Sequence, residues 1–206
     1  MLDYQGKTIL AIAPHIDDVE LGAGATIYNL GKHNNVFYVG LSMPPLVDTK
    51  SFMEEFKDSA KCLGLKPENI ILRNYDPRNL FDSRSEILQL LFDLNKKYKP
   101  DLVFIPNSYD MHQSHEVVHA EGRRAFKHTT MLGYELPWNY TEFSMDVFIT
   151  LDKEALQAKV DAVNAFRTQK SRTFFSNNIV EDLARVRGKQ IEKEYAECFE
   201  LIRWIA

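Results

Sequence analysis

The sequence has few of the features that would set a chain apart from ordinary globular proteins. It has only two cysteines among 206 residues, Cys62 and Cys198, which is too few for a disulfide framework. Both fall in stretches whose apolar periodicity predicts helices, so we expect two buried, reduced thiols. Basic residues are not in excess, since 25 Lys and Arg stand against 29 Asp and Glu. The formal net charge of −4 therefore predicts no nucleic-acid partner.

Long hydrophobic runs are also missing. No apolar stretch approaches the roughly 20 residues that a membrane-spanning helix needs, and the run before His15 is too short for a cleaved signal peptide. We therefore expect a cytoplasmic protein without a membrane span. No internal repeat or linker interrupts the chain, so residues 1–206 are predicted to form a single domain, with homo-oligomerisation left open.

Apolar strands alternate with amphipathic helices in the first half of the chain. This alternation predicts an α/β fold, a doubly wound, mostly parallel, Rossmann-like sheet with helices on both faces. The four buried strands are expected at Thr8–Ala13, Val36–Leu41, Asn69–Leu72 and Asp101–Pro106.

The second half of the chain has weaker strand patterns, followed by helical ones. Strands are predicted around Met131–Leu136 and Val147–Leu151. Helices are predicted at about Lys153–Phe166 and Ile179–Trp204.

Unusual polar residues follow two of the predicted strands. Residues 14–18 (PHIDD) follow the first strand, and residues 110–115 (DMHQSH) follow the fourth. In the common strand order 3-2-1-4-5, the first and fourth strands are neighbours, and ligands bind beyond their carboxyl ends. The topology therefore predicts that these two segments meet.

The residue types in these segments suit a hydrolytic zinc site. Such a site needs three ligands from His and carboxylate residues, an open position, and a nearby base. His15 and Asp18 can turn toward one point, His115 can supply a third ligand, and Asp17 would remain free as the base. The same ligand set suits other divalent metals such as Fe²⁺.

Two segments, AIAPHIDDVELGAGATI and DMHQSHEVVHAEGRRAF, resemble the two motifs of the PIG-L/LmbE zinc-dependent N-acetyl-sugar deacetylases. The tail LARVRGKQIEKEYAECFELIRWI is similar to members of that family as well. The resemblance implies that His15, Asp18 and His115 are metal ligands and that Asp17 is the general base. It implies that His112 helps to hold the oxyanion that forms during hydrolysis.

Three positions depart from the family's pattern. Ile16 replaces a frequent Pro, and Ser114 replaces the usual Asp, which puts the electrostatic role of His112 in doubt. Ser114 is still expected to cap the helix that begins near His115. Many members have an Arg near the start of the second helix that contacts substrate, but the nearby residues here are Lys50, Phe52 and Met53.

Several neighbouring residues have two interpretations. His119, one helical turn after His115, is expected to pack or to form a supporting hydrogen bond rather than to bind metal. Gly22 and Gly24 are expected to allow close packing of the first helix, because a fragment of G-x-G is weak evidence for dinucleotide binding. Glu20 is expected either to contact His15 or simply to favour the helix start.

The segment Tyr134–Asn139 contains candidate substrate contacts. Glu135, Trp138 and Asn139 combine an acid, an aromatic surface and an amide, as sugar sites often do. The alternative is a strand end with Trp138 in the core.

The sequence therefore predicts a zinc-dependent hydrolase that removes an N-acyl group, usually acetyl, from a small-molecule amino-sugar substrate. That substrate could be an amino sugar, a sugar nucleotide or a glycoconjugate precursor, as in surface polysaccharide biosynthesis. Two alternatives remain: an amidase for a thiol-precursor glycoside or another small amide, and a catalytically silent sugar- or nucleotide-binding module.

Overall fold

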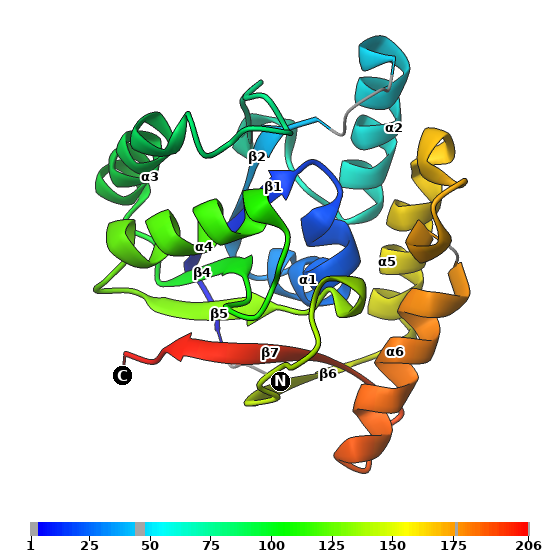
Figure 1. Ribbon diagram of the computed structural model, residues 1–206. Helices are drawn as coiled ribbons and strands as arrows, with labels where there is room; N and C mark the ends of the chain where they lie inside the picture. The colour runs from blue at the N-terminus through cyan, green and yellow to red at the C-terminus, as the bar shows by residue number, and fades with distance from the viewer. Residues whose placement is uncertain (1–3, 44–47, 176, 206) are drawn as a thin grey trace.

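Seven strands form one sheet in the computed structural model, which describes residues 4–43, 48–175 and 177–205 (Figure 1). The strand order is β3-β2-β1-β4-β5-β7-β6. The first five strands in this order run parallel, and β7 is antiparallel to both of its neighbours. The strands are β1 (Thr8–His15), β2 (Asn35–Ser42), β3 (Ile70–Leu72), β4 (Leu102–Pro106), β5 (Thr130–Tyr134), β6 (Val147–Leu151) and β7 (Tyr195–Arg203).

Helices cover both faces of this sheet (Figure 1). On β1, Ile9 and Ala11 pack into the core under α1, α2, α5 and α6, while Leu10 and Ile12 pack against α3 and α4. Strands that are apolar at every position are typical of parallel sheets buried on both sides. The helices are α1 (Asp18–Gly31), α2 (Thr49–Cys62), α3 (Arg84–Tyr98), α4 (Gln113–Ala125), α5 (Lys153–Ala165) and α6 (Asn177–Gln190).

The doubly wound α/β prediction is confirmed, including the order 3-2-1-4-5 of the first five strands. β1 pairs with β4 in register from Ile9 with Leu102 to Ala11 with Phe104. The carboxyl ends of these two strands therefore lie side by side, and α1 and α4 begin shortly after them. Of the helices that the structure describes, none is long and apolar enough to cross a bilayer.

The predicted final helix, Ile179–Trp204, is wrong in its second half. α6 ends at Gln190, and the chain reverses through Glu192, whose φ of 58° is left-handed, before it enters β7. β7 then pairs with β5 and β6, and the buried Glu197 accepts a hydrogen bond of 2.7 Å from the buried Lys159 of α5. These partners are distant in sequence, so local periodicity could not reveal them.

The two cysteines lie apart and are unpaired. Cys198 is buried in β7 rather than in a helix, because the helix prediction for this segment was wrong. Cys62 lies at the end of a helix, α2, as its periodicity predicted, but it is half-buried rather than buried.

Candidate metal centre

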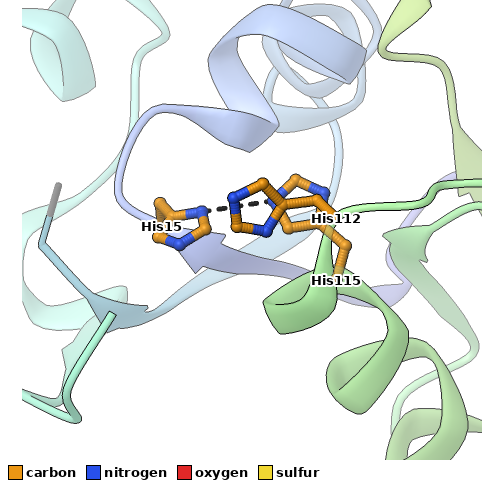
Figure 2. Close-up of side chains that lie close together, drawn as sticks. All are labelled: His15, His112 and His115. Carbon is orange, nitrogen blue, oxygen red and sulfur yellow. Dashed lines mark hydrogen bonds between the residues drawn. The ribbon is translucent and has the colours of Figure 1, made fainter. Parts of the chain in front are cut away.

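Four side chains from two segments converge at the carboxyl ends of β1 and β4. His15 is the last residue of β1 and Asp18 is the first residue of α1. His112 caps the N-terminus of α4, and His115 lies in its first turn. One ring nitrogen from each of His15, His112 and His115 lies within 4.8 Å of the others, so this cluster can hold a metal ion (Figure 2).

A tighter triangle lies within this group. His15 Nδ1 is 3.2 Å from His115 Nε2 (Figure 2), and Asp18 Oδ2 is 3.3 Å and 3.2 Å from these two nitrogens respectively. Ligand atoms about 2.0–2.1 Å from a tetrahedral zinc ion are about 3.3 Å from one another. The three atoms therefore match one face of a tetrahedral coordination sphere.

The protonation of His115 supports this interpretation. Its Nδ1 is 2.7 Å from Asp110 Oδ2, and an ionised carboxylate can only accept, so Nδ1 is the donor. Neutral His115 then directs the lone pair of Nε2 at His15 Nδ1 and Asp18 Oδ2. Electron-rich atoms this close together need a proton or a cation between them.

The short distances between these groups also shift the pKa values of His115 and Asp18. Burial lowers the pKa of His115, but the Asp18 and Asp110 carboxylates outweigh burial and raise it to about 10. Burial likewise opposes ionisation of Asp18, but His115 and His15 hold the pKa of this carboxyl well below its usual range. A divalent ion at Nε2 would replace the proton that His115 otherwise holds.

Asp110 holds this arrangement together. Besides His115 Nδ1, it accepts hydrogen bonds from the backbone N–H of His112 at 2.9 Å and from the side-chain amide of Asn139 at 3.3 Å. A carboxylate that orients a ligating imidazole is a common feature of metal sites. The sequence prediction included Asp110 in the segment after β4 but gave it no role. In the sequence, only the position of Asp110, five residues before the candidate ligand His115, could have indicated a role for it.

His112 lies beside the triangle and is oriented differently. Its Nδ1 accepts a hydrogen bond of 3.3 Å from the backbone N–H of Ser114, so the proton of the neutral ring is at Nε2. Burial, together with the nearby His115 and His15, lowers the pKa of His112 to about 4. His112 is therefore a neutral donor that faces the cavity, whereas Asp18 completes the triangle.

Ser114 does not cap α4, contrary to the sequence prediction. The cap is His112, and the Ser114 hydroxyl instead donates to the Pro77 carbonyl at 3.0 Å. Ser114 is fully buried between α4 and the loop that follows β3, so its hydroxyl bonds to the loop rather than to its own helix.

Asp17 is buried next to the triangle, in an unusual backbone conformation. Its φ is 149°, a value that residues other than glycine rarely adopt, and such strain is often found at functional sites. Burial raises the pKa of Asp17 well above its usual value, and the neighbouring Asp18 and Glu20 carboxylates add to this effect. The side chain lines the cavity but forms no part of the triangle.

The cavity beside these residues has a volume of about 270 Å³. Its lining also includes Trp138, Asn139, Arg172 and Phe174. The ring centroids of Trp138 and Phe174 are 4.7 Å apart and the rings are nearly parallel, at 14°. Arg172 and Phe174 were not identified from the sequence, because no motif marks the segment between α5 and α6.

The three substrate-contact candidates lie in different places. Trp138 is half-buried and lines the cavity. Asn139 also lines the cavity, but its amide donates to Asp110. Glu135 is buried outside the cavity, where it forms an ion pair with Arg187 and accepts from the Tyr140 hydroxyl.

The remaining ambiguous residues also have structural contacts. His119 donates from Nδ1 to the Pro106 carbonyl at 2.9 Å and lies outside the metal cluster. Glu20 lies in the first turn of α1, which agrees with the helix-start interpretation, and it is fully buried and accepts from the Tyr38 hydroxyl at 3.1 Å rather than contacting His15. A Cβ on Gly22 would lie 2.6 Å from the Tyr134 ring, so this glycine does permit close packing of α1.

No family model matches the chain, but the curated proteins that are similar to it in sequence include one named deacetylase. It is the uncharacterized deacetylase YaiS of Escherichia coli (strain K12), which is 27% identical over 175 residues, 79% of this chain and 91% of that protein.

Solved structures share the fold. The conserved protein TT1542 of Thermus thermophilus has a TM-score of 0.82 at 19% identity, over 97% of this chain and 96% of that one. The N,N'-diacetylchitobiose deacetylase of Pyrococcus horikoshii has a TM-score of 0.77 at 21% identity, over 95% and 84% respectively. GalB of Pseudomonas putida, a 4-carboxy-2-hydroxymuconate hydratase, also has a TM-score of 0.77, at 16% identity over 97% and 98%.

The fold alone does not determine the reaction, because the same fold is found in a hydratase and in deacetylases. The resemblance to PIG-L/LmbE deacetylases that the two motifs indicate is nevertheless confirmed, because a deacetylase is similar in sequence and solved deacetylases share the fold.

Proposed function

We propose that the protein is a zinc-dependent hydrolase that removes an N-acyl group, such as acetyl, from an amino sugar, a sugar nucleotide or a glycoconjugate precursor. The observation that carries this proposal is the triangle of His15 Nδ1, Asp18 Oδ2 and His115 Nε2 beside Asp17, a carboxylate outside the triangle. The named activities of YaiS and the pyrococcal deacetylase support the reaction type.

Two imidazoles and one carboxylate suit zinc, and they also suit other divalent metals such as Fe²⁺. Bound at this triangle, a metal ion would supply Lewis-acid chemistry by polarising a carbonyl oxygen and acidifying water. His15, Asp18 and His115 would hold the ion, and Asp110 would orient His115.

The residues outside the triangle have roles in proton transfer and charge stabilisation. A carboxylate with a raised pKa is a stronger base than an ordinary Asp, so Asp17 is suited to take a proton from the attacking water. The same carboxyl can return that proton to the departing amine. The Nε2–H of His112 is suited to donate a hydrogen bond to the amide oxygen as negative charge develops there.

Ser114 in place of the family's Asp does not disturb this arrangement. The backbone N–H of Ser114, which is independent of side-chain type, fixes the ring of His112. This contact argues against the silent binding module, because the donor that faces the cavity is retained. An amidase for a thiol-precursor glycoside would use the same residues and would differ only in the cavity wall.

Metal content and acetate release test the proposal together. Purified protein should contain about one divalent metal ion per chain. It should release acetate from one or more members of a panel of N-acetylated sugars and sugar nucleotides. A chelator should stop the release, and added zinc should restore it. Bound metal without acyl release from any member of the panel would contradict the proposed reaction.

The Asp17→Asn variant tests the base. Asparagine keeps the shape of the side chain but cannot accept a proton, so we expect turnover to fall by about 10²–10⁴-fold. Elemental analysis should show unchanged metal content, because Asp17 is outside the triangle. Loss of metal from this variant would show that Asp17 is a ligand instead.

A further inference from the structure

Arg172 stands apart from the other groups of the cavity wall because it carries a permanent positive charge. It lies between α5 and α6 and is half-buried. Its guanidinium carbon is 5.8 Å from the centroid of the Phe174 ring, and Phe174 stacks on Trp138. One wall of the cavity therefore combines two aromatic rings with a cation.

The segment that contains Arg172 is firmly anchored. The buried Glu55 of α2 accepts hydrogen bonds from the Thr168 backbone N–H at 3.1 Å and from its hydroxyl at 2.7 Å. The backbone N–H of Arg172 donates to the carbonyl of the buried Gln169 at 2.9 Å, and Phe175 is buried in the core. The position of Arg172 at the cavity is thus fixed by packing on both sides.

Arg172 has no ion-pair partner among the residues that the structure describes. Other arginines before and after it differ in this respect, since Arg167 pairs with Glu55 and Asp58 and Arg187 pairs with Glu135. A guanidinium that is partly withdrawn from water and lies in a ligand cavity is suited to bind an oxyanion, often through two parallel hydrogen bonds.

We propose that Arg172 binds an anionic group of the substrate, so that the preferred substrate is an N-acylated amino sugar bearing a phosphate or a carboxylate. This inference rests on the proposed function. The cavity of about 270 Å³ is near the lower end of ligand-site volumes, so it suits one sugar unit. The rings of Trp138 and Phe174 provide an apolar surface for the sugar ring, and the Arg172 guanidinium pairs with the anionic group of the sugar.

Steady-state kinetics of Arg172→Gln test the inference. The substrates are N-acetylglucosamine, its 1-phosphate and 6-phosphate, and N-acetylmuramic acid, which separate the neutral sugar, the phosphate and the carboxylate. We expect kcat/KM to be at least about 10-fold higher for one anionic sugar than for the neutral one. Arg172→Gln should raise KM for that sugar by about 10–100-fold, the range of a hydrogen bond to a charged group. The loss of kcat/KM should be at least about 10-fold smaller for the neutral sugar, because that sugar has no charged group to pair with Arg172.

The matched control is Lys170→Gln, which removes a positive charge from an exposed residue of the same segment. This variant should have the same kcat and KM as the wild-type protein with all four sugars. An equal loss on neutral and anionic sugars in Arg172→Gln would overturn the inference, because Arg172, whose charge also lowers the pKa of Asp17, would then act through that base rather than on substrate. The absence of any preference for an anionic sugar would overturn it as well.

A binding measurement separates this inference from the proposed function. Calorimetry of chelator-treated protein should show glucosamine 6-phosphate or glucosamine 1-phosphate binding at least about 10-fold tighter than glucosamine. The difference should disappear in Arg172→Gln. Equal affinities would overturn an Arg172 phosphate site. Arg172-dependent binding without acyl release from any sugar would count against the deacetylase and not against the anion site.

Discussion

A single residue, Asp110, contacts two histidines of the candidate metal centre before a metal ion binds. Its two carboxylate oxygens contact His115 Nδ1 and the backbone N–H of His112, so one side chain orients both His115 and the N-cap residue of α4. The negative charge also makes the His115 ring a better electron donor.

Asp110→Asn should therefore weaken metal binding without breaking the fold. Asparagine can still accept the hydrogen bond from His115, but it lacks the charge. We expect metal affinity to fall by about 10–100-fold, measured by competition with a chromophoric chelator. Ser108, two residues earlier and partly exposed, provides a control in Ser108→Ala, which should keep the original affinity.

Glu20 is a buried acid whose ionisation should limit stability at high pH. Burial, with help from Asp18, raises its pKa from 4.5 to about 8, although the Tyr38 hydroxyl and its own backbone amide oppose this shift. The folded protein thus holds a proton that the unfolded chain releases above about pH 4.5. The contribution of Glu20 to the free energy of unfolding is therefore highest below that pH and falls until the pH exceeds about 8.

Glu20→Gln should remove this dependence, because glutamine resembles the protonated acid and cannot ionise. Relative to the variant, wild-type protein should lose on the order of several kcal/mol between pH 5 and pH 8.5. Urea unfolding of chelator-treated protein at both pH values measures the difference. Parallel pH profiles for the two proteins would show that Glu20 is already ionised in the fold.

At the scale of elements, α1 lies so close to the sheet that position 22 has no room for a side chain. Gly22 faces Tyr134 of β5, and a methyl group there would lie 2.6 Å from the ring. Gly31, at the other end of the same helix, has nothing within 4 Å of the equivalent position. The two glycines therefore form a matched pair for mutation.

Gly22→Ala should destabilise the protein by about 1–3 kcal/mol, since the Tyr134 ring must move to admit the methyl group. Gly31→Ala should instead stabilise the protein slightly, by up to about 1 kcal/mol, because alanine favours the helix. Thermal or urea unfolding of both variants gives the comparison. Equal effects at the two positions would mean that α1 is not tightly packed at Gly22.

At the scale of the whole molecule, metal binding should be linked to proton release. In the metal-free fold the pKa of His115 is about 10, so the ring is charged at neutral pH, and the stability from this proton is lost as pH rises through about 10. A metal ion at Nε2 must displace that proton.

We expect zinc binding at pH 7.5 to release at least one proton, and release from His115 to vanish above about pH 10. Calorimetry in two buffers of different ionisation enthalpy counts the protons. His115→Ala should bind zinc weakly and without this release. Zinc binding by wild-type protein at pH 7.5 with no proton release would place the ion away from His115.

Local pattern was sufficient for the first five strands and for the residues at their ends. Continuous apolar runs predicted β1 and β4, and the polar residues after them predicted that His15 and His115 would meet. The metal roles of these residues and the base role of Asp17 remain predictions. The enzyme class inferred from the motifs agrees with the named activities of YaiS and the pyrococcal deacetylase.

Features that depend on distant partners were not predictable in this way. Tyr195–Arg203 was expected to be helical, but pairing with β5 and β6 makes it a strand. Glu135 was expected to contact substrate, but Arg187 of α6 holds it outside the cavity. Asp110 belongs to the second motif but was given no role, and Arg172 lies in no motif, because the roles of both depend on which side chains the fold places beside them.

The sequence by itself determined the parallel sheet and the two polar segments at its carboxyl edge, because strand burial and chain order are local and topological properties. Tertiary structure alone decided which atoms face one another at 3.2–3.3 Å, which acids are paired, and which arginine of the described residues faces the cavity without an ion-pair partner. Such contacts join segments up to 100 residues apart, and their geometry is fixed only when the core between those segments is packed.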